Sequence, residues 1–129
     1  GEAAERVRAG VEATRAGPPR PRLPVVVVHG VDDGLVPMAF TSLPYVEAAR
    51  AAGRDVRFWQ VERAQHFDAF LGLPAMGPHY VPLMPYVHAA LDRVWAHLHE
   101  GAPLPADARI RARGRGNDAQ LDARHLAIP

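Results

Sequence analysis

The feature that most constrains this chain is an unbroken run of four valines, Val25–Val28, which ends in His29 and Gly30. A strand with one exposed face alternates apolar and polar residues, and this run does not alternate. It is typical instead of a strand covered on both faces, as the strands of parallel sheets are. The run therefore predicts a buried parallel strand with Gly30 at its C-terminal end.

Helical spacing of apolar residues and a second β-rich segment define the elements around this strand. The spacing predicts helices over 2–16, 43–52 and 84–99, and the segment Asp55–Val61 predicts a second strand. Glycine and proline divide 62–82, which we expect to be mostly loop with one helical turn. In the last helix the apolar positions form a single stripe, made of Val87, Leu91, Val94, Trp95 and Leu98.

The order helix, strand, helix, strand, helix indicates the α/β class, with parallel strands and helices on the faces of the sheet. Two strands cannot cover both faces and both edges of such a sheet. We therefore expect residues 1–100 to be the C-terminal part of a larger catalytic domain, and to be marginally stable alone. The shift to Pro, Ala, Asp and Arg after Gly101 predicts an irregular tail over 101–129.

Composition argues against several classes of function. Fifteen basic residues, all arginine, balance 14 acidic ones, so the net charge of +1 favours neither nucleic acid nor a membrane surface as a partner. No apolar run approaches the ~20 residues of a membrane-spanning helix. The absence of cysteine excludes disulfides, thiolate metal sites and a cysteine nucleophile.

Two local patterns look like binding sites, but their spacing argues against both. His97 and His99 stand two positions apart in a predicted helix, so they point to different faces and cannot share a metal ion; we expect no metal and no cofactor. The second pattern is a set of four arginines without interleaved aromatic residues, which argues against RNA binding. These are Arg109, Arg111, Arg113 and Arg115.

Candidate catalytic residues follow each predicted strand. Asp33 lies in the loop after the valine strand, where open α/β sheets place their active sites. The pattern H-G-x-x-D-x-x-V-P from His29 to Pro37 resembles the acid-bearing loop of α/β-hydrolases, although Asp32 and Asp33 would also suit the simpler role of capping a turn. His66 follows the second strand, 33 residues later, in the order acid then histidine that such hydrolases use.

The chain offers no nucleophile to complete this pair. Its one serine, Ser42, has no G-x-S-x-G sequence around it and follows Asp33 instead of preceding it. We expect Ser42 to open the next helix as an N-cap or turn residue. A catalytic serine would then lie upstream of Gly1, and the chain alone is expected to be inactive.

Three stretches of the sequence resemble the C-terminal region of the bacterial 3-hydroxybutyrate oligomer hydrolases, which are α/β-hydrolase-type serine esterases. They are residues 23–54, 58–74 and 79–107, and the most distinctive segment is A-Q-H-F-D-A-F around His66. The resemblance implies hydrolysis of (R)-3-hydroxybutyrate dimers and oligomers to monomers during polyhydroxybutyrate degradation. It also implies an acyl-enzyme on the absent serine, Asp33 as the acid, His66 as the base, a small-molecule ester as substrate, and a secreted location.

Two alternatives remain open at this point. The generic acid loop also suits another carboxylesterase or a prolyl-oligopeptidase-type peptidase, which would share the fold but not the substrate. A non-catalytic module that keeps the hydrolase scaffold as a binding surface is the second alternative. Oligomeric state cannot be deduced from the sequence.

Overall fold

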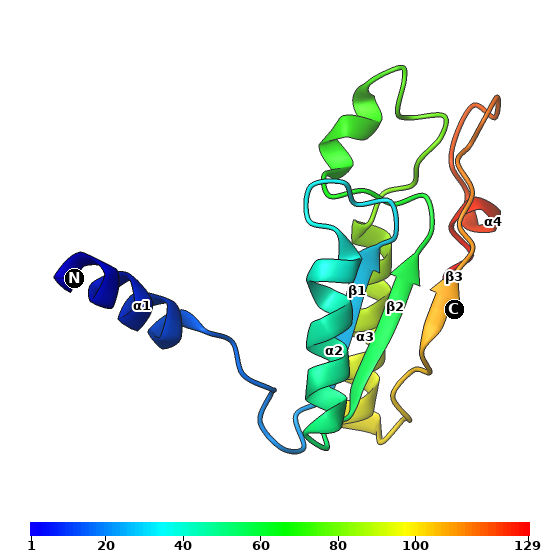
Figure 1. The fold of residues 1–129 in the computed structure, drawn as a ribbon. Coiled ribbons are helices and arrows are strands. Elements are labelled where there is room, and N and C mark those ends of the chain that lie inside the picture. Colours follow the sequence, from blue (N-terminus) through cyan, green and yellow to red (C-terminus); the bar gives the residue numbers. More distant parts are fainter.

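A parallel three-stranded sheet forms the centre of the structure (Figure 1), a computed structural model that describes residues 1–129. The strand order is β1 (Val25–Gly30), β2 (Val56–Val61), β3 (Ala108–Ile110). Val25 pairs with Val56 at one end of the first ladder, and Gly30 pairs with Val61 at the other. The α/β class and the first two strands are therefore as predicted, and the third strand was not predicted.

One helix covers each face of the sheet (Figure 1). Helix α2 (Ser42–Ala51) packs on the face that carries Val25, Val27, Val56 and Phe58. Helix α3 (Met84–Glu100) packs on the opposite face, where Val26, Val28, Trp59 and Val61 lie. The two sets alternate along the strands, which explains why β1 has no polar position before His29.

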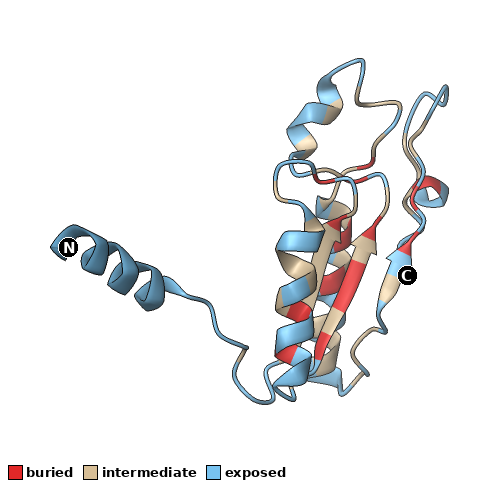
Figure 2. Cartoon of the chain, viewed as in Figure 1, coloured by how far each residue is buried: buried red, intermediate tan, exposed pale blue.

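The expected irregular tail is partly wrong, because residues 101–129 contain β3 and a short helix, α4 (Ala123–Leu126). From Arg109 to Arg113 arginines alternate with buried Ile110 and Ala112, and this period of two suits a strand. Strand β3 pairs with β2 in parallel, with Val61 opposite Ile110. The tail thus covers one edge of the sheet and adds to its core (Figure 2).

The other edge of the sheet is open. The valines of β1 are only half-buried, since no strand pairs with their outer side. On the neighbouring helix α3, Tyr86 and Ala90 are buried, whereas most of the predicted apolar stripe is exposed. An apolar groove of about 390 Å³ runs between β1 and this stripe, with Val26, Val28, Val87 and Leu91 among its lining residues.

The remaining elements are short or peripheral. Helix α1 (Glu2–Thr14), close to the predicted helix, buries no residue and extends away from the sheet (Figure 1). Two 3-10 turns, Met38–Phe40 and Asp68–Gly72, lie in the loops, the second being the single helical turn expected in 62–82. None of the helices combines the length and the apolar character needed to cross a bilayer.

Candidate active site

The structure brings Asp33 and His66 into contact at the C-terminal edge of the sheet. Nδ1 of His66 lies 2.8 Å from Oδ2 of Asp33, the distance of a charge-assisted hydrogen bond. The two residues stand in the loops that follow β1 and β2, and adjacent parallel strands end at the same edge. The sequence predicted both residues, and the fold places them together.

Asp33 is positioned by its own turn. Its Oδ1 accepts hydrogen bonds from the backbone N–H groups of Leu35, at 3.0 Å, and Val36, at 2.8 Å. The capping role considered from the sequence is therefore real, but it uses only one carboxylate oxygen and leaves Oδ2 for His66. Burial raises the pKa of Asp33, and the hydrogen bonds from Val36, His66 and Leu35 outweigh this effect and hold the pKa below its ordinary 3.8.

A close backbone approach fixes the two loops against each other. A Cβ atom on Gly30 would lie 2.4 Å from the carbonyl oxygen of Ala64, so only glycine fits at the end of β1. The neighbouring Asp32 connects the same loops, because its N–H donates to the Ala64 carbonyl at 3.2 Å and its Oδ2 accepts from the Arg63 N–H at 2.9 Å. Asp32 is thus used for structure, and Asp33 is the carboxylate that reaches a histidine.

The second ring nitrogen of His66 has no protein partner. The pair borders a pocket of about 180 Å³, whose lining includes His29, Val36 and Leu83. His29 is held beside the pair, since its Nε2 donates to the Val36 carbonyl at 3.0 Å. A group bound in this pocket would lie against His66, whose second ring nitrogen is free to accept or donate a proton.

Asp68 has a role that sequence reasoning missed. Its carboxylate accepts hydrogen bonds from the N–H groups of Leu83, at 2.6 Å, and Met84, at 3.0 Å, where α3 begins. Because Asp68 follows His66 by only two residues, this contact fixes the His66 loop to the helix. The contact joins residues 15 positions apart, so no local capping pattern in the sequence predicts it.

Ser42 does not join the pair. It is the first residue of α2, and Thr41 occupies the N-cap, so the predicted N-cap position is one residue off. The hydroxyl of Ser42 is buried and makes no hydrogen bond. The chain therefore brings a carboxylate and a histidine together, and places no serine hydroxyl beside His66.

His97 and His99 each contact a neighbouring group near the C-terminal end of α3. Nδ1 of His97 donates to the Ala102 carbonyl at 2.7 Å, and the ring of His99 lies 4.0 Å from that of Trp95, measured between centroids. Nowhere in the structure do three or more His, Asp or Glu side chains gather in a way that could hold a metal ion.

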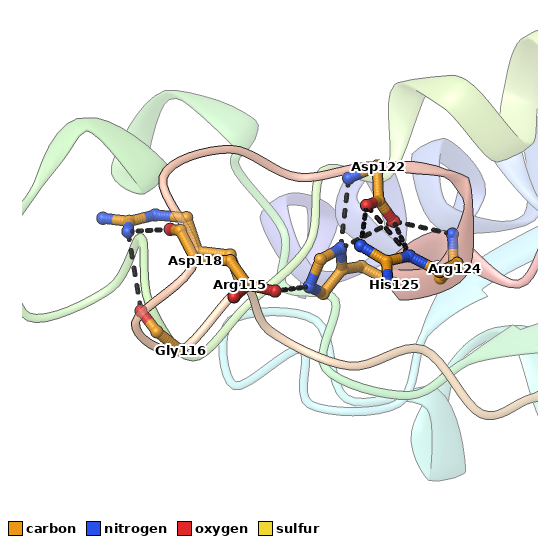
Figure 3. Close-up of polar contacts among 6 residues, drawn as sticks. All are labelled: Arg115, Gly116, Asp118, Asp122, Arg124 and His125. Carbon is orange, nitrogen blue, oxygen red and sulfur yellow. Dashed lines mark hydrogen bonds and ion pairs between the residues drawn. The ribbon is translucent and has the colours of Figure 1, made fainter.

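A histidine with a carboxylate at each ring nitrogen was not predicted (Figure 3). His125 is buried, with Nε2 3.0 Å from Oδ2 of Asp118 and Nδ1 3.0 Å from Oδ1 of Asp122. The Arg124 side chain hydrogen-bonds the Asp122 carboxylate and lowers its pKa. The backbone carbonyl of His125 accepts the N–H of Arg113 at 2.8 Å, so this cluster fixes the end of the tail to the segment that continues β3.

Comparison with known proteins places the chain in a family. The 3HB-oligomer hydrolase (3HBOH) family model matches residues 1–128. A D-(-)-3-hydroxybutyrate oligomer hydrolase of Paracidovorax citrulli is 42% identical over 121 residues, which cover 88% of this chain and 17% of that protein. Proteins of the same name from Burkholderia thailandensis and Burkholderia mallei are each 38% identical, over 85% and 82% of this chain and 16% of their own length.

The chain thus spans about one sixth of the length of these curated relatives. No solved structure matches it. The family model covers nearly the whole chain, including both loops that carry Asp33 and His66. The chain belongs to the 3HB-oligomer hydrolase family.

Proposed function

We propose that this chain supplies the acid and the base of a serine esterase that hydrolyses 3-hydroxybutyrate oligomers to monomers. The observation that carries the proposal is the 2.8 Å contact between Asp33 Oδ2 and His66 Nδ1, with the other ring nitrogen left without a protein partner. The names of the relatives support the substrate. Hydrolysis of an ester needs water but no redox cofactor, and we propose none.

In the proposed reaction His66 moves a proton at its unoccupied nitrogen. It takes the proton from a serine hydroxyl as that oxygen attacks the ester carbonyl, and gives it to the leaving alcohol as the ester C–O bond breaks. Water then attacks the acyl-enzyme by the same route and releases the acid. Asp33 keeps the ring in the correct tautomer and stabilises the imidazolium that forms between these steps.

The nucleophilic serine and the oxyanion hole are proposed to come from the part of the protein that precedes this chain. An α/β-hydrolase domain carries its serine before the acid and the histidine in sequence, on a strand of the same sheet. The open edge of β1 and the apolar groove beside it are the surfaces that further strands and helices of such a domain would cover. We therefore regard this chain as the C-terminal part of an α/β-hydrolase fold.

The test is release of 3-hydroxybutyrate from its purified dimer by the full-length protein that carries this chain. His66→Ala is expected to lower kcat/KM by about 10⁴- to 10⁶-fold, and Asp33→Asn by about 10⁴-fold. Asp55→Asn is the matched control, since this exposed carboxylate pairs with Arg57 just before the start of β2 and should leave the rate unchanged.

Each outcome decides a different part of the proposal. Activity that persists in His66→Ala would show that His66 is not the base. If the folded parent releases no monomer, the proposed substrate is wrong, and a peptide or another ester should be tested in its place. A parent with no hydrolase activity on any of these would favour the non-catalytic binding module.

A further inference from the structure

Three arginines near the candidate active site have no partner in the structure. Ten arginines follow residue 22, and the side chains of seven donate a hydrogen bond to a carboxylate or a carbonyl group. The remaining three are Arg63, Arg111 and Arg113. All three line one pocket of about 430 Å³. Arg6, Arg8, Arg20 and Arg22 also make no side-chain hydrogen bond or ion pair, but they belong to the N-terminal segment that precedes the sheet.

This pocket has an excess of positive charge. Glu62 also lines it, but its carboxylate is engaged by Arg109 at 2.7 Å. The nearby Asp32 carboxylate accepts the backbone N–H of Arg63. No carboxylate lies within ion-pair distance of the three free guanidinium groups, and such a cluster suits an anionic ligand.

The backbone beneath these side chains is firmly placed. Arg63 has φ +59°, a left-handed conformation that a bulky residue rarely adopts, and it is fixed by the Asp32 contact and by a hydrogen bond from the Val81 N–H to its carbonyl at 2.7 Å. On the opposite wall, a Cβ atom on Gly114 would lie 2.4 Å from the Pro78 carbonyl oxygen. The tail therefore packs closely on the segment that forms the rest of the pocket.

The pocket lies on the loop that carries the base. Arg63 precedes His66 by three residues, so their Cα atoms are at most about 11 Å apart even if the chain between them is fully extended. A 3-hydroxybutyrate oligomer is an ester chain that ends in one free carboxylate. When the last ester bond is cleaved, this carboxylate belongs to the leaving alcohol, the group to which His66 returns the proton in the proposed mechanism.

We propose that the pocket formed by Arg63, Arg111 and Arg113 binds the terminal carboxylate of the oligomer and places the last ester bond beside His66. This inference rests on the proposed function and adds the direction in which the oligomer binds. The proposal gives a role to two of the four alternating arginines of the tail, Arg111 and Arg113. The other two bind groups of the same chain: Arg109 binds Glu62, and Arg115 binds the Asp118 carbonyl. The three arginines are positioning residues and take no part in bond breaking.

The experiment compares two substrates in the full-length protein: the 3-hydroxybutyrate trimer as free acid and the same trimer as its methyl ester. Arg63→Gln and the double variant Arg111→Gln/Arg113→Gln should lower kcat/KM for the free acid by about 10- to 100-fold, because a charge-assisted contact is lost. Hydrolysis of the neutral methyl ester should stay within about two-fold of the parent. The inhibition constant of 3-hydroxybutyrate, measured against methyl ester hydrolysis, should rise in the same variants.

Two controls separate this effect from a general loss of charge. Arg6→Gln/Arg8→Gln removes two exposed arginines of α1 and should change neither substrate. Arg111→Lys keeps the charge and should retain most of the activity on the free acid. Added salt should raise KM for the free acid more than for the methyl ester.

An equal loss on both substrates would overturn the proposal, since it would show that the arginines contact another part of the protein. Unchanged kinetics on both substrates would overturn it as well. A parent protein that cleaves neither trimer, although folded, would instead refute the proposed function, and this subsite would fall with it.

Discussion

Two histidines of this chain hydrogen-bond carboxylates, and they do so in different ways. His66 meets one carboxylate, that of Asp33, and about a third of its side chain is exposed to solvent. His125 has carboxylates at both ring nitrogens, and only 7% of its side chain is exposed (Figure 3). A histidine can accept a proton from a substrate only through a nitrogen that is unoccupied, so the first arrangement suits a base and the second suits a structural clamp.

In the surroundings of both histidines, a glycine allows two backbone segments to pack closely together. Each region contains a glycine in close contact with a carbonyl group: Gly30 with that of Ala64 near Asp33 and His66, and Gly114, in the tail, with that of Pro78. Both glycines hold two segments at a distance that a Cβ atom would not permit. The difference lies in what the segments carry, since Gly30 aligns Asp33 with His66 and Gly114 holds the tail in place.

The strongest test of this comparison is a matched pair of glycine variants in the full-length protein. Gly30→Ala should push apart the loops of Asp33 and His66 and lower kcat by about 100-fold, the cost of a misplacement of about 1 Å. Gly114→Ala should leave kcat on the neutral methyl ester within about two-fold, because it moves only the tail. Steady-state kinetics on the methyl ester measures both, and equal losses in kcat would contradict the division of roles.

The contact between Asp33 and His66 was predictable because their positions depend on a simple rule. Parallel neighbouring strands end at one edge of a sheet, so an acid after the valine strand and a histidine after the next strand come to the same edge. The uninterrupted valines identified the first strand. The structure explains them, because successive valines face α2 and α3 in turn and both faces are apolar. This part of the site needed only local patterns and chain order.

The contacts that hold the site were not predictable in the same way. Strand β3 has only three residues, one of them the exposed Arg109, so it carries too little apolar pattern to be recognised. Asp68 caps a helix 15 residues away, and His125 lies in a segment without a known motif. The exposed stripe of α3 was expected from its periodicity, but periodicity does not say which layer covers it.

Replacing His125 should destabilise the protein more than replacing His66, although His66 is the residue proposed to matter more for activity. His125→Ala removes a buried ring with partners at both nitrogens and should lower the free energy of unfolding by about 1–3 kcal/mol. His66→Ala should lower it by less than about 1 kcal/mol, since the ring is partly exposed. Urea denaturation of the two variants measures both changes.

Asp118→Asn is the control for the clamp. Its side chain is 63% exposed, and a contact at that degree of exposure contributes little, so the expected change is within about 0.5 kcal/mol. If His66→Ala destabilises the protein as much as His125→Ala, both histidines are structural. The distinction between base and clamp would then fail.

The smallest expected effect is a difference in acid sensitivity that arises from Asp33. Its pKa is lower in the folded protein than the ordinary 3.8, so its ionised form stabilises the fold at pH values above the ordinary value. That contribution is lost as the pH falls from about 4 through the depressed pKa, because the folded carboxylate must then take up a proton. Asp33→Asn cannot ionise, so its Tm should fall less between pH 5 and pH 3 than that of the parent.

Thermal unfolding of both proteins across this range measures the difference, and Asp55→Asn should follow the parent because that carboxylate is exposed. Parallel curves for the parent and Asp33→Asn would mean that the bonds from Leu35, Val36 and His66 do not favour the charged form in solution. The Asp33 carboxylate would still be ionised at neutral pH, but these bonds would then add nothing to the stability of the folded protein. The distinction from the His125 cluster would then rest on the unoccupied ring nitrogen of His66 alone, since His125 has carboxylates at both nitrogens.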